Sequence, residues 1–320
     1  MARGEHQGRG RRALGRLGAA ALTLALVVVI VFGVVDALAD PAALALGPTA
    51  SPDEVARLRG AWGLDRPFLT RLGELFLRLA RLDLGESLIQ RIPVSTLIAR
   101  AAGPTLAYAL PGTLLAGLVG VAGGLAAARR GGAIDRLVHA LGALLVSTSS
   151  VVLVIGASEL LAHRLGLFPI LGWPLAGSSR SPSELLALPI LLWALLQLGP
   201  DLRHYRAIFV RELAAPHLDG LRARGIGEAK LLVHVLRGAI GPILARLAAR
   251  LPHLLVGSLV LEVAFGIPGL GALAVSALRR GDLAVLEGIA LCTAAVTIVG
   301  QHLLAFGAGA VDPRLREGPR

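Results

Sequence analysis

Cysteine, lysine and aromatic residues are scarce in this sequence. The only cysteine, Cys292, lies inside an apolar run, so a disulfide framework and a cysteine-based metal site are both excluded. The only lysine, Lys230, follows an alanine, whereas the phosphate-binding loop G-x-x-x-x-G-K-[ST] needs a lysine after glycine. The chain therefore cannot hydrolyse ATP through such a loop.

Motifs for hydrolytic or metal chemistry are missing as well. Neither H-E-x-x-H nor G-x-S-x-G occurs, and the histidines are scattered without metal-ligand spacing. We therefore predict no catalytic residue, no metal ligand and no cofactor bound by this chain. The formal net charge of +11 does not indicate nucleic-acid binding, because aromatics are only 4% of the residues and the arginines gather between apolar runs.

The chain is rich in apolar residues. Of its 320 residues 55% are hydrophobic and 17% are charged, and the mean hydropathy is +0.71. Runs of this length span a bilayer only as helices, because every backbone polar group must be satisfied within lipid. The sequence predicts an all-α membrane protein with six transmembrane helices, at residues 17–39, 101–128, 137–161, 185–202, 239–264 and 283–310.

The first apolar run has two interpretations. It follows the basic segment 1–16, and Ala37 to Ala39 supply an A-x-A site, as in a signal peptide. Its roughly 20 apolar residues, however, exceed the usual 7–15 of a signal peptide and suffice to cross a membrane. We interpret it as a retained helix.

The basic residues predict the orientation. With the N-terminus inside, the inner segments hold 18 basic residues and the two short outer loops hold four. The positive-inside rule then places both termini, including the tail 311–320, in the cytoplasm of a bacterial inner membrane. Contact with membrane lipid follows from the same topology.

The segment 40–100 would lie outside and carries helix signals. Ser51 is a suitable N-cap, with Pro52 in the first turn, and Gly60 can end that helix. Apolar residues then recur at helical spacing, which predicts an amphipathic helix at the outer interface or on the membrane domain. These residues are Phe68, Leu72, Leu75, Phe76, Leu79 and Leu82.

The cytoplasmic segment 203–237 contains an unusual polar stretch, LDGLRARGIGEAKLLVHVLRGAIGP. Its pattern predicts a short helix, a left-handed end at Gly225 and a second helix that begins at Glu228. A short helix with an apolar ridge and a basic rim suits docking of a soluble partner, although a basic loop on anionic lipid is the alternative. The candidate coupling residues are Leu218, Leu221, Arg222, Arg224, Gly225, Gly227 and Glu228.

Two further features are candidates for a pathway or gate. Arg246 and Arg250 lie about a turn apart in the fifth apolar run, where they either face a cavity or pack near the cytoplasmic end. The sequence EVAFGIPGLG ends that run in a glycine- and proline-containing turn, which is either a gate or a simple loop in which Glu262 pairs with Arg279 or Arg280. The candidates are Arg246, Arg250, Glu262, Phe265, Gly266, Pro268 and Gly269.

Several of these stretches resemble one family, the permease subunits of oligopeptide and dipeptide (peptide/nickel)-type ABC importers, in particular the member with the long outer segment. The similar stretches are WGLDRP at 62–67, LDLGESL at 82–88, TLAYA at 105–109, RARG at 222–225, HVLRGAIGPI at 234–243, EVAFGIPGLG at 262–271 and VDPRLR at 311–316. Their order and spacing match across most of the chain.

The resemblance implies a type I permease core at 101–310 with a helical insertion between the first two spans. It also implies a second permease subunit, two ATP-binding subunits that use the ATP, and an external solute-binding protein. The alternative is a channel or secondary transporter without an ATPase, which predicts inverted repeats with broken helices. We find no such internal symmetry, and the substrate does not follow from the sequence.

Overall fold

The computed structural model describes residues 2–38, 40–47, 49–174, 181–257 and 259–311. The predicted tail 311–320 lies almost entirely outside the described residues. All elements of the described chain are helices, apart from one isolated bridge between Glu86 and Pro93. The chain divides into two compact units, residues 1–102 with 270–300 and residues 103–269 with 301–320.

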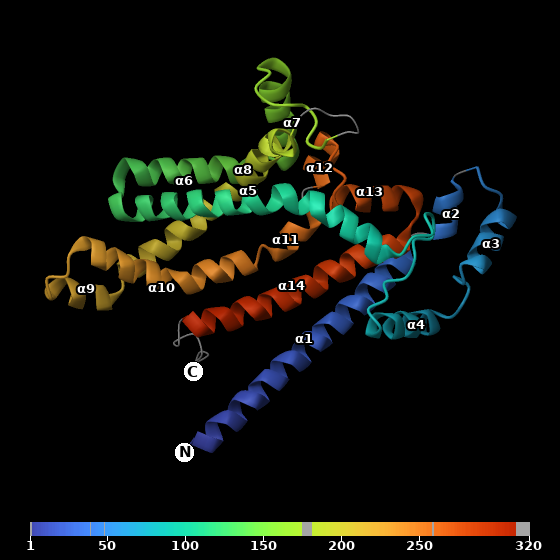
Figure 1. Cartoon of the computed structure of the whole chain (residues 1–320), viewed down its shortest axis with the longest axis horizontal. Coiled ribbons are helices and arrows are strands. Elements are labelled where there is room, and N and C mark those ends of the chain that lie inside the picture. Colours follow the sequence, from blue (N-terminus) through green and yellow to red (C-terminus); the bar gives the residue numbers. More distant parts are fainter. Residues whose placement is uncertain (1, 39, 48, 175–180, 258, 312–320) are drawn as a thin grey trace. The chain divides into compact units, whose positions relative to one another are not determined.

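Unit 1 contains the outer segment and the helices at the two ends of the described chain. Its elements are α1 (Ala2–Leu38), α2 (Pro41–Leu46), α3 (Pro52–Ala61), α4 (Phe68–Ala80), the start of α5 (Val94–Arg130), α13 (Leu270–Arg280) and most of α14 (Leu283–Val311) (Figure 1). Ser51 is the N-cap of α3 and Pro52 opens the helix, as predicted. Ser51 and Glu54 also form a reciprocal capping box. The predicted end at Gly60 is one residue short of the observed end at Ala61.

The amphipathic helix α4 packs inside unit 1. Leu75 is buried against Val28 and Phe32 of α1 and Leu291 of α14, and Leu72 and Leu79 border this cluster. Leu82 was predicted to continue the stripe, but it lies beyond the helix end, has a φ of 57° and is 90% exposed. Burial of the α4 stripe therefore fixes the outer segment onto the apolar helices of the same unit.

Unit 2 contains the remaining helices. They are the rest of α5, α6 (Gly132–Ser147), α7 (Ser150–Ser158), the π-helix η1 (Glu159–Arg164), α8 (Pro182–Leu213), α9 (Pro216–Ala223), α10 (Glu228–Ala248), α11 (Leu251–Val256) and α12 (Leu259–Phe265). In Figure 1, α5, α6 and α8 run alongside one another, and α9 closes the turn between α8 and α10.

Glycines allow α5 to approach α8 closely. A Cβ at Gly124 would stand 2.7 Å from the backbone nitrogen of Arg206, and one at Gly120 would stand 2.8 Å from Cβ of Asp201. Small residues at such crossings let two backbones pack without intervening side chains, as is common in membrane helices. The side chains of α8 are consequently held against α5.

The described part of the chain contains five helices that are long and apolar enough to cross a membrane, or up to seven if each bent helix pair is one span. The predicted run 137–161 is such a pair, since α6 and the helix that follows it are bent by 96°. The run 185–202 lies within the longer α8, which continues into polar residues.

The predicted fifth span, 239–264, is wrong as one continuous helix. The apolar helix here is α10, which begins at Glu228 and ends at Ala248, followed by the short helices α11 and α12. Pro252 lies in the first turn of α11, where its ring is tolerated but would disrupt a helix interior. Gly257, with a φ of 65°, then separates α11 from α12. The hydropathy of the run 239–264 did not indicate these two interruptions of the helix.

Candidate functional site

The short helix α9 is anchored between α8 and α10 by one leucine. Leu218 is fully buried against Tyr205, Phe209 and Leu231, and Leu221 is partly buried at the edge of the same cluster. The predicted exposed apolar ridge of Leu218 and Leu221 is therefore wrong for Leu218, whose side chain faces its own chain. The buried leucine fixes α9 relative to the helices on either side.

The turn after α9 follows the predicted pattern. Gly225 adopts a φ of 71°, the left-handed conformation expected of a glycine at a helix end. Gly227 is the N-cap of α10 with extended backbone, and Glu228 is its first residue. The Glu228 carboxylate lies 3.3 Å from the guanidinium of Arg129 at the end of α5. Backbone geometry and this ion pair together define how α10 begins.

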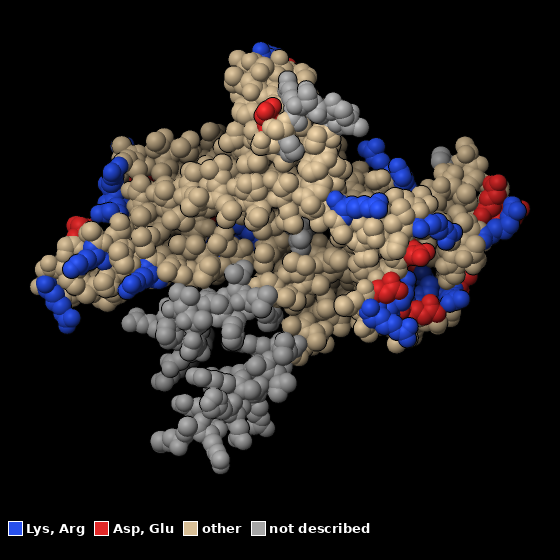
Figure 2. Space-filling view, viewed as in Figure 1, with Lys and Arg blue, Asp and Glu red and all other residues tan. Residues whose placement is uncertain are grey.

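The outer side of α9 is polar and exposed. Arg222 and Arg224 are exposed, and Arg222 donates to Asp219 at 2.8 Å within the helix. Figure 2 shows basic side chains gathered over α9 and the adjoining end of α10. A helix that is already fixed in place and has an exposed basic surface is suited to bind another protein, because little conformational freedom is lost on docking.

A buried ionic cluster links α8 to the end of α10. Arg250 contacts the carboxylate of Asp201, and Arg246 Nε donates to the same Asp201 Oδ1 at 3.4 Å. Arg250 also donates to the carbonyl oxygen of Gln197 at 3.4 Å. Asp201 is 0% exposed and Arg250 is 3% exposed. These charges are thus almost entirely removed from solvent inside an apolar helix pair.

Within the described ranges, several polar atoms in and beside the cluster have no hydrogen-bond partner. They are Gln197 Nε2, Asp201 Oδ2, Tyr205 OH, and Nε and Nη1 of Arg250. Unpaired polar atoms in a buried site are costly, so they mark a place where water, solute or movement completes the bonding. Beside the cluster, a cavity of about 440 Å³ is lined by His204, Arg211 and Arg246 among others.

The two arginines both contact a carboxylate on α8. This contact is compatible with a pathway role and with packing near the cytoplasmic end, so both alternatives stay predictions. Arg250, at 3% exposure, does not extend to an interface. Arg246 borders the cavity while contacting Asp201, so a pathway role remains a prediction for this residue.

Glu262 lies at the centre of a second buried polar group in unit 2. Its Oε1 accepts hydrogen bonds from Thr105 Oγ1 at 2.8 Å and from Tyr108 OH at 3.0 Å. A Cβ at Gly257 or Gly269 would overlap the Glu262 carboxylate, so both glycines are required for this close approach. The carboxylate therefore connects α5 with the α12 region.

The turn after α12 has the predicted interruption. The helix ends at the buried Phe265, and Gly266 follows with a φ of 63°. The Phe265 carbonyl accepts from Gly172 N at 2.9 Å, and Pro268 is exposed. Phe265 contributes to the core of unit 2 and is thus part of a fixed turn. The role of this turn in gating stays a prediction.

Comparison with known proteins identifies the family. Residues 120–317 match the family described as binding-protein-dependent transport system inner membrane component. The chain belongs to this family. A relative named as a peptide transport system permease protein from Brucella abortus is 33% identical over 307 residues, which covers 95% of this chain and 98% of that protein.

Two other relatives of this inner membrane component carry more specific names. A dipeptide transport system permease protein from Lactococcus lactis is 29% identical and covers 95% of this chain and 98% of the relative. A glutathione transport system permease protein from Salmonella typhimurium is 30% identical and covers 92% of this chain and 95% of the relative. The similarity therefore extends over nearly the full length in each case.

The sequence analysis missed three residues that the structure places in the two buried polar groups, the Asp201–Arg250 cluster and the Glu262 group. The sequence analysis assigned no role to Asp201, and it included Thr105 and Tyr108 only as part of the stretch TLAYA. An acid directly after Pro200 in an apolar helix was the available signal, because a lone intramembrane carboxylate requires a partner. No group of three or more His, Cys, Asp or Glu that could hold a metal occurs in the described ranges.

Proposed function

We propose that this chain is the permease subunit of an ATP-driven ABC importer for peptides or a related small solute. It forms half of the translocation pathway, and a second permease subunit supplies the other half. The names of the similar proteins support the substrate class, since three of them are peptide, dipeptide and glutathione transport permeases. The chain is not itself an enzyme in this proposal.

One structural observation carries the coupling part of the proposal. Leu218 anchors α9 against α8 and α10, while the basic side of α9 is exposed. A force applied to α9 by a bound subunit therefore reaches two long apolar helices directly. Rigid transmission of this kind is what allows one site to bias the conformation of another.

The proposal also includes ATP-binding subunits and an external solute-binding protein. Two ATP-binding subunits dock on the 212–237 segment and consume the ATP, so this chain binds no cofactor of its own. An external solute-binding protein delivers the cargo to the opposite side. Both termini then lie in the cytoplasm and the protein resides in the bacterial inner membrane, in agreement with the distribution of basic residues.

Co-purification with the ATP-binding subunits tests the proposal. We would tag this chain, extract the complex in mild detergent and compare wild type with an Arg222→Glu, Arg224→Glu double variant. The double variant reverses the charge of the exposed side of α9 without touching Leu218. Its matched control is Arg57→Glu, Arg91→Glu, which reverses two exposed arginines of the outer segment.

We expect the ATP-binding subunits to accompany wild type and the control but to be lost from the α9 variant. Retention by the α9 variant would overturn the docking site. Absence of any ATP-binding subunit from the wild-type complex would instead favour the ATPase-independent channel or secondary transporter. Uptake of labelled peptide into proteoliposomes, with and without ATP, would distinguish an ATP-driven importer from a channel or secondary transporter.

A further inference from the structure

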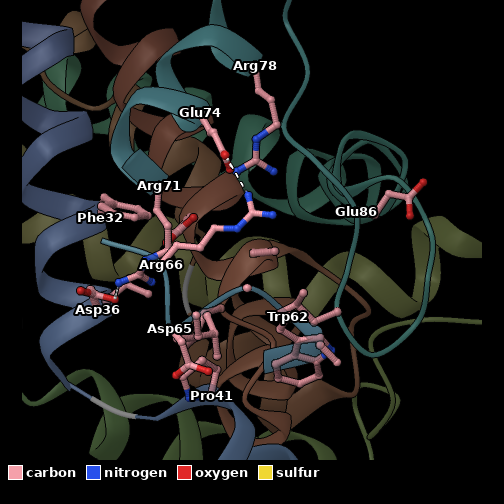
Figure 3. Close-up of a pocket in the computed structure, with 18 of the residues that line it drawn as sticks. Phe32, Asp36, Pro41, Trp62, Asp65, Arg66, Arg71, Glu74, Arg78 and Glu86 are labelled. Carbon is pink, nitrogen blue, oxygen red and sulfur yellow. Dashed lines mark hydrogen bonds and ion pairs between the residues drawn. The ribbon is translucent and has the colours of Figure 1, made fainter. Parts of the chain in front are cut away.

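Unit 1 contains a cavity to which the proposed transport mechanism assigns no role. Its volume is about 870 Å³, and it is bordered by α1, α4, the loop between α3 and α4, and the start of α14. Figure 3 shows arginines of α4 and the preceding loop on one side, and Trp62 and Glu86 on the other. Pockets of 300–1,000 Å³ are of the size that encloses a small organic ligand.

Most charges of this cavity are already neutralised in pairs. Arg66 lies 2.9 Å from Glu74, and Arg71 Nη2 lies 2.5 Å from Asp36. Arg71 also packs over the ring of Phe32, with 5.6 Å between the guanidinium carbon and the ring centroid. These paired groups shape the walls of the cavity and leave little net charge to attract a ligand.

Four charged side chains of the cavity, Arg78, Arg81, Glu86 and Glu287, are not paired in this way in the described part of the chain. Arg78 and Glu287 are the two of these four that lie within helices. Arg78 of α4 and Glu287 of α14 both line the cavity, and neither has an ion-pair partner within 4.0 Å in the part of the chain that the structure describes. Within the described residues, neither Arg78 nor Arg71 forms an ion pair with Glu287, and Arg71 is paired with Asp36 instead. The opposite charges therefore face a shared space without closing it.

The two groups lie in different surroundings. Glu287 lies in an apolar membrane helix, one turn after Leu283, where an ionisable residue is costly and usually functional. Arg78 is exposed, and its Nη1 lies over Gly85, where a Cβ would stand 2.8 Å from it. Gly85 also has a φ of 80°, so this loop conformation favours glycine.

We propose that this cavity binds a zwitterionic ligand between Glu287 and Arg78. The carboxylate of Glu287 holds the ammonium group, and the guanidinium of Arg78 holds the anionic group. Both bonds are charge-assisted, the strongest class of hydrogen bond available to a small ligand. The inference does not depend on the proposed transport function, because it concerns groups of unit 1 alone.

Two sources supply this chemistry. A free peptide or amino acid carries an ammonium and a carboxylate, and a phosphatidylethanolamine headgroup carries an ammonium and a phosphate. The shared feature is a positive and a negative group within one small ligand. The experiment therefore tests first which charged group of the ligand is needed for binding. It then tests whether the ligand is a soluble zwitterion or a lipid headgroup.

The first measurement is calorimetric titration of the full chain in nanodiscs of phosphatidylcholine and phosphatidylglycerol. The probes are dialanine, N-acetyl-dialanine and dialanine amide. We expect dialanine to bind at least about tenfold more tightly than either blocked form, because each block removes one charge-assisted bond. Equal binding of all three, or no binding of any zwitterion, would overturn the proposal.

Variants assign each terminus to its residue. Glu287→Gln should lose the preference for the free ammonium while keeping the preference for the free carboxylate, and Arg78→Gln should show the reverse. Glu184→Gln and Arg57→Gln are matched controls at exposed positions outside the cavity. A variant that loses both preferences together, while it elutes as a folded monodisperse protein, would contradict the assignment.

A third arm separates the two sources. Glycerophosphoethanolamine replaces the peptide as a soluble probe, and native mass spectrometry of the chain from phosphatidylethanolamine membranes counts retained lipid. Retention of this lipid by wild type and its loss from both variants would identify the headgroup. Peptide binding without lipid retention would identify the soluble zwitterion, and failure of both probes would overturn the site.

Discussion

Both units carry exposed ion pairs, but the most buried ion pair of unit 2 is far more enclosed than that of unit 1. In unit 1, the outer segment carries several ion pairs whose side chains remain open to solvent, such as Arg66 and Glu74 at 60% and 49% exposure. Figure 2 shows acidic and basic groups interspersed over α3 and α4. In unit 2, Asp201 and Arg250 are instead almost completely enclosed by apolar helices.

This difference shows why the surroundings of an ion pair decide how much it contributes to the free energy of unfolding. An exposed pair in water contributes little, because solvent screens the attraction and two flexible side chains lose freedom. A buried pair is costly to form, yet the removal of one partner leaves an uncompensated charge. Similar side chains therefore serve as adjustable surface contacts in unit 1 and as an obligatory group in unit 2.

The largest expected effect breaks the buried cluster. Asp201→Ala leaves Arg246 and Arg250 without their shared carboxylate, and we expect the free energy of unfolding to fall by about 3–5 kcal/mol. Thermal unfolding of the purified protein in detergent measures this loss. In contrast, Glu74→Ala in unit 1 should cost no more than about 1 kcal/mol, since the Glu74–Arg66 pair is exposed.

A triple replacement sharpens the same comparison. Asp201→Leu, Arg246→Met, Arg250→Met removes all three charges together, and we expect most of the stability to return because no charge is left unpaired. Transport of the proposed cargo should remain impaired if the cluster also acts in the pathway. A triple variant as unstable as Asp201→Ala would contradict the ionic explanation and point to packing.

The second effect concerns the anchor of α9. Leu218→Ala removes a fully buried side chain, which typically costs about 2–5 kcal/mol. We expect amide hydrogen exchange in α9 to accelerate strongly, because this short helix depends on that contact. Leu82→Ala, at a leucine that is 90% exposed in unit 1, should leave exchange unchanged. Equal effects of the two variants would mean that α9 is held by other contacts.

Local signals in the sequence predicted local structure well in both units. Ser51 and Pro52 identified the start of α3, and Gly225 and Glu228 identified the turn into α10, because caps and left-handed glycines depend on neighbouring residues only. The six-run pattern also indicated a helical membrane protein, although its count falls between the five and seven spans possible in the described chain.

Contacts distant in sequence were not predictable in the same way. Asp201 and Arg250 are 49 positions apart, and Arg250 lies in the break after α10 that hydropathy did not reveal. Glu262 likewise reaches Thr105 and Tyr108 on α5. A periodic pattern tells which face of a helix is apolar, but it does not tell which other helix that face will contact.

The third effect isolates backbone strain at the end of α9. Gly225→Ala places a Cβ in open space but forces alanine into a φ of 71°, so we expect a loss of about 1–2 kcal/mol. Gly227→Ala is the matched control, since Gly227 has a φ of −64° and equally open surroundings. Unfolding in detergent and exchange of the α9 amides both report the difference. Identical behaviour of the two alanine variants would exclude a strain effect.

The smallest expected effect is a pH dependence in the outer segment of unit 1. Asp40 caps α2 by accepting from Ala42 N, and Arg59 Nη1 lies 2.7 Å from its carboxylate. Burial raises the pKa of Asp40, but the hydrogen bonds from Arg59 and Ala42 outweigh it and hold the pKa below its ordinary value of 3.8. The stabilisation is therefore complete well above that value and is lost as the pH falls below it.

Amide exchange in α2, corrected for the intrinsic pH dependence, measures this change between about pH 5 and pH 2. We expect protection to fall only about twofold to fivefold, since the ion pair is partly exposed. Asp40→Asn keeps a side-chain oxygen for the cap but removes the charge, so its corrected exchange should be flat over this range. A variant with the wild-type pH profile would assign the titration to another carboxylate, and an effect as large as that of Asp201→Ala would contradict the contrast between the two units.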